Sequence, residues 1–175
     1  GTWERGSGSP DWIYKSWDTW LSEWIQDLGR TIDYLESRKD IDTENLALLG
    51  LSFGGILAPA FSAYEDRIKV VILVAGGIVF SAAQPKPKAF IARHATAPTL
   101  MLNGKHDFTF PVETHQKAMF DLIGTPPEHK RHVIYDAGHL PLPRVPMLKE
   151  IMAWLDKYQG PVDGKGAEEQ TKKEK

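Results

Sequence analysis

The stretch LALLGLSFGGILAPA (residues 46–60) decides the fold. The apolar run at 46–51 is typical of a buried strand, and a second apolar segment of helical length follows it. Between them, Ser52 stands among small glycine residues. A serine at a strand-to-helix junction either caps the helix or is presented as a nucleophile. The rest of the sequence has to decide between these two interpretations.

The composition describes one ordinary globular domain. The chain has 175 residues, of which 42% are hydrophobic and 25% charged, which excludes a disordered or membrane-embedded chain. Its 21 basic and 23 acidic residues give a net charge of −2, so neither nucleic acid nor an anionic membrane is expected as a partner. The absence of cysteine excludes disulfides and thiolate metal sites.

The two ends of the chain differ from its middle. The N-terminal GTWERGSGSPDW has no basic segment followed by an apolar run, so it is not expected to be a signal peptide, and we leave the compartment open with the cytoplasm favoured. The first residue is not methionine, which suggests a processed or excised piece. We expect the domain to span residues 1–160 and residues 161–175 to form a disordered tail, because almost no apolar side chain follows Gly160.

Helical and strand patterns alternate along the chain. The elements expected are helices at 17–38, 53–64, 111–123 and 146–158, strands at 45–51, 70–76, 99–104 and 132–135, and an irregular excursion at 76–97. This alternation predicts the α/β class, with a mostly parallel sheet flanked by helices. The unbroken apolar strand at 45–51 is of the kind expected in a sheet that is covered on both faces.

Three chemically active residues follow predicted strands. Ser52, Asp107 and His139 come after the strands at 45–51, 99–104 and 132–135. Because chemistry collects at the carboxyl ends of parallel strands, we expect the three to converge. A histidine can take the serine proton near neutral pH, and an aspartate can orient the imidazole. The sequence therefore predicts a catalytic triad.

The residues around Ser52 match a G-x-S-x-G nucleophile elbow. We expect glycine at 50 and 54 because a sharp turn brings its neighbours too close for side chains. The turn would expose the hydroxyl, and the backbone N–H of Phe53 would be one oxyanion donor.

Other residues and other roles compete with this assignment. In the simplest alternative Ser52 caps the helix and the other two residues are loop residues. Asp136, three residues before His139, is a rival for the acid but is expected in a turn. No histidine pair has metal-ligand spacing with a carboxylate in support, so we predict no metal. We also expect no cofactor. The remaining histidines are expected on the surface or explained by solvation: His94, His106, His115, His129 and His132.

The segments GLSFGG, LMLNGKHDFTFPVETHQKAMFDLIGTPPEHKRHVIYDAGH and EIMAWLDKY resemble the α/β-hydrolase superfamily, in particular its dienelactone hydrolase, acetyl-xylan esterase and prolyl-oligopeptidase-like members. The resemblance covers roughly residues 1–160 and implies a Ser52–Asp107–His139 triad. It also implies that the chain is the C-terminal part of the domain, lacking the first strands and the loop that supplies a second oxyanion N–H.

These observations lead to a functional prediction. We expect a serine carboxylesterase that works through an acyl-enzyme on a small-molecule, uncharged ester, with Phe108, Phe110 and Leu140 lining the substrate pocket. The alternatives are a peptidase-like amide hydrolase of the prolyl-oligopeptidase type and a non-catalytic hydrolase fragment. An incomplete sheet would expose a strand edge, so we also expect a homo-oligomer or a complementing N-terminal segment as partner.

Overall fold

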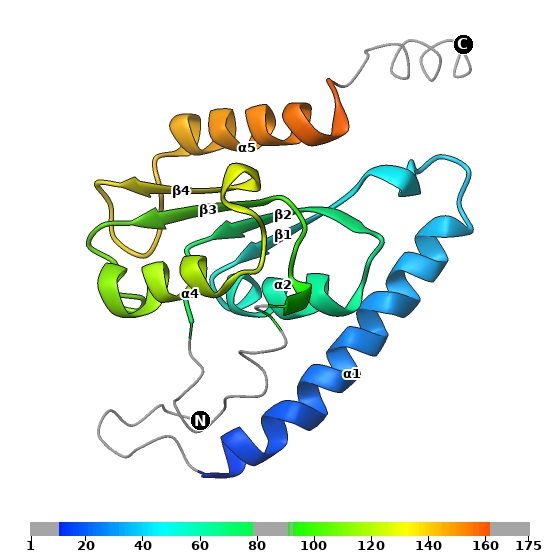
Figure 1. Ribbon diagram of the computed structural model, residues 1–175, viewed down its shortest axis with the longest axis horizontal. Coiled ribbons are helices and arrows are strands. Elements are labelled where there is room, and N and C mark those ends of the chain that lie inside the picture. Colours follow the sequence, from blue (N-terminus) through cyan, green and yellow to red (C-terminus); the bar gives the residue numbers. More distant parts are fainter. Residues whose placement is uncertain (1–10, 79–90, 92, 162–175) are drawn as a thin grey trace. The chain divides into compact units, whose positions relative to one another are not determined.

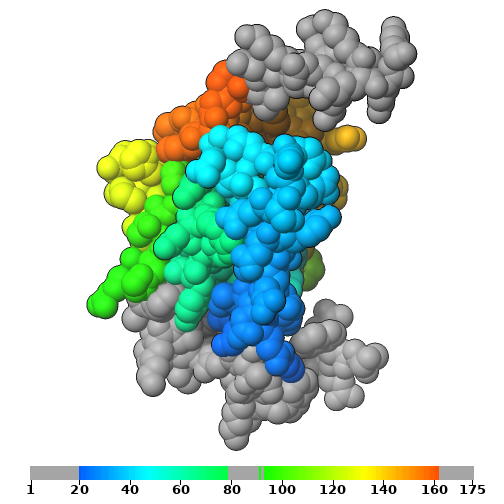
Figure 2. Space-filling model, turned by 90° about the vertical axis from the view of Figure 1, so that its right-hand side faces the viewer, coloured from blue at the N-terminus to red at the C-terminus, as the bar shows by residue number. Residues whose placement is uncertain are grey.

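The computed structural model describes residues 11–78, 91 and 93–161 and divides the chain into two units, Gly1–Thr43 and Glu44–Lys175. The first unit contains α1 (Asp11–Glu36), drawn in blue in Figure 1; the part of it that is coloured in Figure 2 is also blue. This helix begins earlier and ends earlier than the predicted 17–38. Within the described residues, no helix is both long and apolar enough to cross a membrane.

The second unit is built around a four-stranded sheet with the order β1-β2-β3-β4, and all its strands are parallel (Figure 1). Each strand follows its neighbour in the sequence, helices lie in the connections from β1 to β2 and from β3 to β4, and a last helix follows β4. The elements are η1 (Thr43–Asn45), β1 (Leu46–Leu51), α2 (Phe53–Tyr64), β2 (Ile68–Val74), β3 (Thr99–Gly104), η2 (Val112–Gln116), α4 (Lys117–Leu122), η3 (Pro127–His129), β4 (Lys130–Tyr135) and α5 (Arg144–Gln159). This architecture confirms the predicted α/β class.

The predicted elements agree with the structure to different degrees. The helix at 53–64 and the strand at 99–104 have the predicted bounds. The helix predicted at 111–123 instead begins with the π-helical turn η2, because the N–H groups of His115 and Gln116 both donate to the carbonyl of Pro111. Residues 79–90 and 92 of the predicted excursion, and the tail beyond residue 161, lie outside the described residues.

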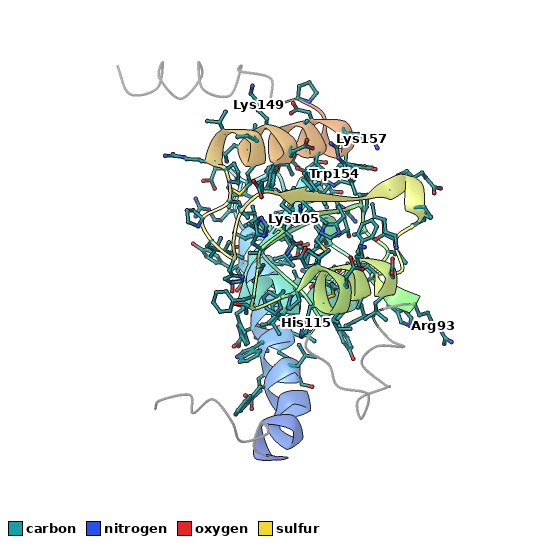
Figure 3. All side chains as sticks on the ribbon, turned by 90° about the vertical axis from the view of Figure 1, so that its left-hand side faces the viewer. Arg93, Lys105, His115, Lys149, Trp154 and Lys157 are labelled. Atoms are coloured by element: carbon teal, nitrogen blue, oxygen red, sulfur yellow. The ribbon has the colours of Figure 1, made fainter. Side chains whose placement is uncertain are left out.

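The sheet has helices on both faces, with α5 on one side and α2 and α4 on the other (Figure 1). The central strands β2 and β3 are almost entirely buried. Trp154 is buried on the sheet side of α5, as Figure 3 shows. The core beneath α5 consists of Val70, Ile72, Val74, Leu100, Leu102, Leu142, Ile151 and Trp154. This packing fixes the carboxyl ends of the strands, where the candidate residues lie.

The strand β1 is less covered than its apolar sequence predicts. Among the described residues it pairs with β2 alone, and Leu49 and Leu51 are 51% and 50% exposed. The prediction that both faces of this strand are covered is therefore wrong. The reason is its position at the edge of the sheet, where α2 packs on one face and alternate side chains point to the other.

Candidate active site

Ser52 occupies the turn between β1 and α2 in a backbone conformation that side chains rarely adopt, with φ 51° and ψ −106°. Its N–H donates to the carbonyl of Val74 at 2.8 Å, so the turn is tied to the end of β2. Its hydroxyl makes no capping bond to α2. Instead, Ser52 Oγ lies 2.8 Å from Nε2 of His139. The interpretation of Ser52 as a helix cap is wrong.

The glycines at the turn have different roles. A Cβ on Gly50 would lie 2.3 Å from the carbonyl oxygen of Gly54, so only glycine fits at position 50. A Cβ on Gly54 would meet nothing within 4 Å. The steric requirement for glycine is therefore confirmed at position 50 and wrong at position 54. The backbone carbonyl of Gly54 obstructs a side chain at position 50, whereas a side chain at position 54 would point into open space.

Asp107 and His139 are joined by a second hydrogen bond. His139 Nδ1 lies 2.8 Å from Asp107 Oδ2, and the Asp107 side chain is completely buried. The other carboxylate oxygen, Oδ1, accepts hydrogen bonds from the backbone N–H groups of Thr109 at 2.8 Å and Phe110 at 3.0 Å. The structure thus brings the three predicted residues into one hydrogen-bonded chain.

The chemistry of these groups fixes the direction of that chain. A carboxylate can only accept, so Nδ1 of His139 donates its hydrogen to Asp107. In the neutral imidazole this leaves Nε2 as the acceptor that faces Ser52 Oγ. The imidazole is therefore oriented so that it can take the hydroxyl proton.

The loops that carry Asp107 and His139 are held together by their backbones. The N–H groups of Lys105 and His106 donate to the carbonyls of Tyr135 and Ala137 at 2.8 and 2.9 Å. These two bonds extend the β3–β4 pairing beyond the strand ends. The extension holds Asp107 and His139 at a fixed separation.

The rival acid, Asp136, has a different partner. Its Oδ1 lies 2.7 Å from Nε2 of His106, and both side chains are largely exposed. His106 is thus on the surface, as expected. Of the two aspartates, Asp107 is the one that is hydrogen-bonded to His139.

The apolar residues predicted to line a pocket lie in different environments. Phe110 is buried, its ring centroid is 5.5 Å from that of His139, and it packs against Gly77. Phe108 is 86% exposed and Leu140 46% exposed. Phe53, the proposed oxyanion donor, is the first residue of α2 and has a half-exposed side chain.

A partly buried polar chain that the sequence did not predict links β4, β3 and the segment after β2. His132 Nε2 lies 3.1 Å from Asn103 Oδ1, and Asn103 Nδ2 donates to the carbonyl of Gly76 at 2.8 Å. Burial lowers the pKa of His132 from 6.5 to about 4, with a further contribution from the charge of Lys117. The prediction that solvation explains His132 is wrong. The described residues contain no group of three or more His, Cys, Asp or Glu that could hold a metal ion.

Comparison with known proteins gives a family and a fold. The model of the dienelactone hydrolase family matches residues 11–140. The zinc-bound structure of a cold-adapted esterase from an Arctic intertidal metagenomic library superposes with a TM-score of 0.66 at 21% identity, over 79% of this chain and 59% of that chain. An acetyl xylan esterase from Paenibacillus sp. R4 superposes with a TM-score of 0.60 at 23% identity, over 77% of this chain and 52% of that chain.

A protein found by sequence similarity matches a shorter region of this chain. YtaP of Bacillus subtilis (strain 168) is 38% identical over 48 residues, which are 27% of this chain and 16% of that protein. The chain thus spans between half and two thirds of the two solved structures, and a small part of YtaP. At these identities the structural likeness establishes the fold.

Proposed function

The chain belongs to the dienelactone hydrolase family, and from this membership and the Ser52–His139–Asp107 chain we propose that it is a serine hydrolase that cleaves carboxylic esters. The observation that carries the proposal is the 2.8 Å distance between Ser52 Oγ and His139 Nε2. The esterases among its structural relatives support the choice of an ester as substrate.

The first half of the reaction forms an acyl-enzyme. His139 Nε2 takes the proton of Ser52 while Oγ forms a bond to the ester carbonyl carbon. Collapse of the tetrahedral intermediate breaks the bond to the leaving alcohol, which takes the proton from Nε2. Asp107 keeps Nδ1 protonated and stabilises the charged imidazolium during these steps.

The second half releases the acid. A water gives one proton to His139 Nε2, and its oxygen attacks the acyl carbon. The bond to Ser52 Oγ then breaks and Oγ recovers the proton from the imidazolium. The net result is one ester bond replaced by an acid and an alcohol, with the three residues returned to their starting state.

The negative charge on the carbonyl oxygen requires hydrogen-bond donors. We assign one donor to the backbone N–H of Phe53, because this residue begins α2 directly after the nucleophile, where the helix N-terminus favours negative charge. Loss of a single donor in other serine hydrolases costs about 3–4 kcal/mol of transition-state stabilisation. With one assigned donor, we expect slow turnover by the chain alone.

The substrate is proposed to be an uncharged ester with an apolar acyl or alcohol group. Phe108 and Leu140 directly follow Asp107 and His139 in the sequence, and both expose large apolar side chains. Exposed apolar side chains next in sequence to Asp107 and His139 favour an apolar group over a charged one. We assign Phe108, Phe110 and Leu140 to the substrate pocket.

The proposal is tested with p-nitrophenyl acetate and butyrate and with a fluorophosphonate probe. Wild type should turn over the esters and be labelled, and Ser52→Ala should lose both properties. Ser37→Ala is the matched control, since Ser37 is exposed and its hydroxyl only donates to the carbonyl of Tyr34. Turnover that survives in Ser52→Ala would remove the nucleophile from the proposal.

The same experiment separates the alternative functions. Faster hydrolysis of peptide p-nitroanilides than of the esters would indicate an amide hydrolase. Failure of the folded wild type both to hydrolyse and to be labelled would indicate a non-catalytic hydrolase fragment.

The open edge of β1 supports a proposal about partners. Leu49 and Leu51 expose apolar surface on a strand that is paired on one side. We propose that a second copy of the chain, or a separate N-terminal segment, covers this edge.

A further inference from the structure

Gln116 is a buried polar side chain outside the Ser52–His139–Asp107 chain. It is fully buried, and its Nε2 donates to the backbone carbonyls of Gly104 at 2.9 Å and Phe110 at 2.8 Å. These carbonyls stand at the two ends of residues 104–110, which we call the acid loop because it carries Asp107. A single amide group therefore ties together both ends of the acid loop.

The amide has only one favourable orientation. Both partners are acceptors, so the NH₂ group must face them and Oε1 must point away. Oε1 is buried without a hydrogen-bond partner among the described residues. A buried unpaired acceptor costs stability, and methionine would fill a similar volume without one. What the glutamine adds at this position is its pair of donors.

The position of the Asp107 carboxylate depends on the segment that Gln116 holds. Asp107 Oδ1 accepts from the N–H of Phe110, and Gln116 donates to the carbonyl of the same residue. The Phe110 ring also packs 5.5 Å from the ring of His139. A shift of the Phe110 backbone would move both the carboxylate and the aromatic ring that contact the imidazole.

We infer that Gln116 is a positioning residue that holds the acid loop closed and thereby sets the geometry of the Asp107–His139 pair. Its effect on turnover rests on the proposed function, whereas its effect on the hydrogen bond between Asp107 and His139 does not. Gln116 itself is fully buried and acts through its bonds to the acid loop.

The first test compares Gln116→Met with Thr125→Val. Thr125 is also buried and also donates to a backbone carbonyl, that of Ala97 at 2.6 Å, but it lies outside the acid loop. Gln116→Met should lower kcat about tenfold, while Thr125→Val keeps the wild-type kcat. In an Asp107→Ala background, Gln116→Met should have no further effect, because the acid it positions is absent.

Two results would overturn the inference in this test. One is a folded Gln116→Met variant with the wild-type kcat. The other is a tenfold loss that persists in the Asp107→Ala background, which would show that Gln116 acts through something other than the acid.

A second test needs no turnover. In wild type, NMR should show slow solvent exchange of the two Gln116 side-chain amide protons and a low-field proton from Nδ1 of His139, assigned by its loss in His139→Gln. Gln116→Met should broaden or remove the low-field signal, and Thr125→Val should keep it. Fast exchange of the Gln116 amide protons in wild type overturns the inference even if Gln116→Met does not fold. If the Gln116 amide protons exchange slowly but the chain hydrolyses no ester, the proposed function is contradicted and the inference about Gln116 is not.

Discussion

The backbone of Gly104, at the end of β3, lies directly against the carbonyl of Gly138: a Cβ at position 104 would lie 1.9 Å from that oxygen. Gly104→Ala should therefore push apart the loops that carry Asp107 and His139. We expect a loss of about 3 kcal/mol of unfolding free energy or more, with a strong loss of activity. Gly138→Ala is the matched control, since its Cβ would meet nothing within 4 Å. Chemical denaturation measures both, and equal stability of the two variants would contradict this contact.

The turn at Ser52, between β1 and α2, contains a second pair of glycines. Gly50→Ala would place a Cβ 2.3 Å from the carbonyl oxygen of Gly54 and should destabilise the turn and abolish activity. Gly54→Ala has open space within α2, and alanine favours the helix by about 0.5–1 kcal/mol, so its melting temperature should rise slightly. Thermal unfolding checks both. A Gly54→Ala variant as unstable as Gly50→Ala would show that the turn is tighter than the structure indicates.

The two aspartates near His139 should respond differently to removal of charge. Asp107→Asn keeps the shape, but its amide oxygen must accept from the N–H groups of Thr109 and Phe110, so its NH₂ group faces His139 Nδ1. The imidazole then adopts the wrong tautomer, and kcat should fall about a thousandfold or more. Asp136→Asn removes only an exposed pair with His106, and kcat should change less than twofold. Ester hydrolysis measures both. A larger loss in Asp136→Asn would make Asp136 the functional acid.

Much of this architecture could be predicted because its signals are local. The run at 46–51 and the order of Ser52, Asp107 and His139 follow from short patterns. An exposed strand edge follows from the incomplete sheet, but the identity of the exposed side chains, such as Leu49, depends on which elements flank β1. Gln116 was missed, although Val112, Gln116, Met119 and Ile123 follow helical spacing and place it on the buried face. The two carbonyls to which Gln116 donates could not be predicted, because their positions depend on how the acid loop folds.

The edge of β1 should control self-association. If a second copy covers this edge, wild type should elute as an oligomer in size-exclusion chromatography with light scattering, and Leu49→Lys should shift it to monomer. Leu148→Lys is the control, because Leu148 is also exposed but lies on α5. A wild-type chain that stays monomeric at high concentration leaves the separate N-terminal segment as the proposed partner. An oligomer unaffected by Leu49→Lys would place the interface elsewhere.

His132 should make stability depend on pH in a defined window. Its pKa is lowered to about 4 in the folded protein, against 6.5 in the unfolded chain, so between these values the unfolded chain binds more protons. The stabilising contribution is present above pH 6.5 and is lost as pH falls toward 4. Between pH 7 and pH 5 the loss amounts to at most about 2 kcal/mol, and to less because the ring is partly exposed.

The variant His132→Gln isolates this contribution. Glutamine can still donate a hydrogen bond to Asn103 Oδ1, but it does not titrate, so its unfolding free energy should fall less between pH 7 and pH 5 than that of wild type. The other histidines, including the exposed His106, contribute equally to both pH profiles, so subtracting one profile from the other cancels their effect. Urea unfolding at several pH values gives both profiles. Parallel profiles would mean that His132 accepts a proton in the folded state as readily as in the unfolded one, and that the buried chain to Asn103 and Gly76 tolerates its charge.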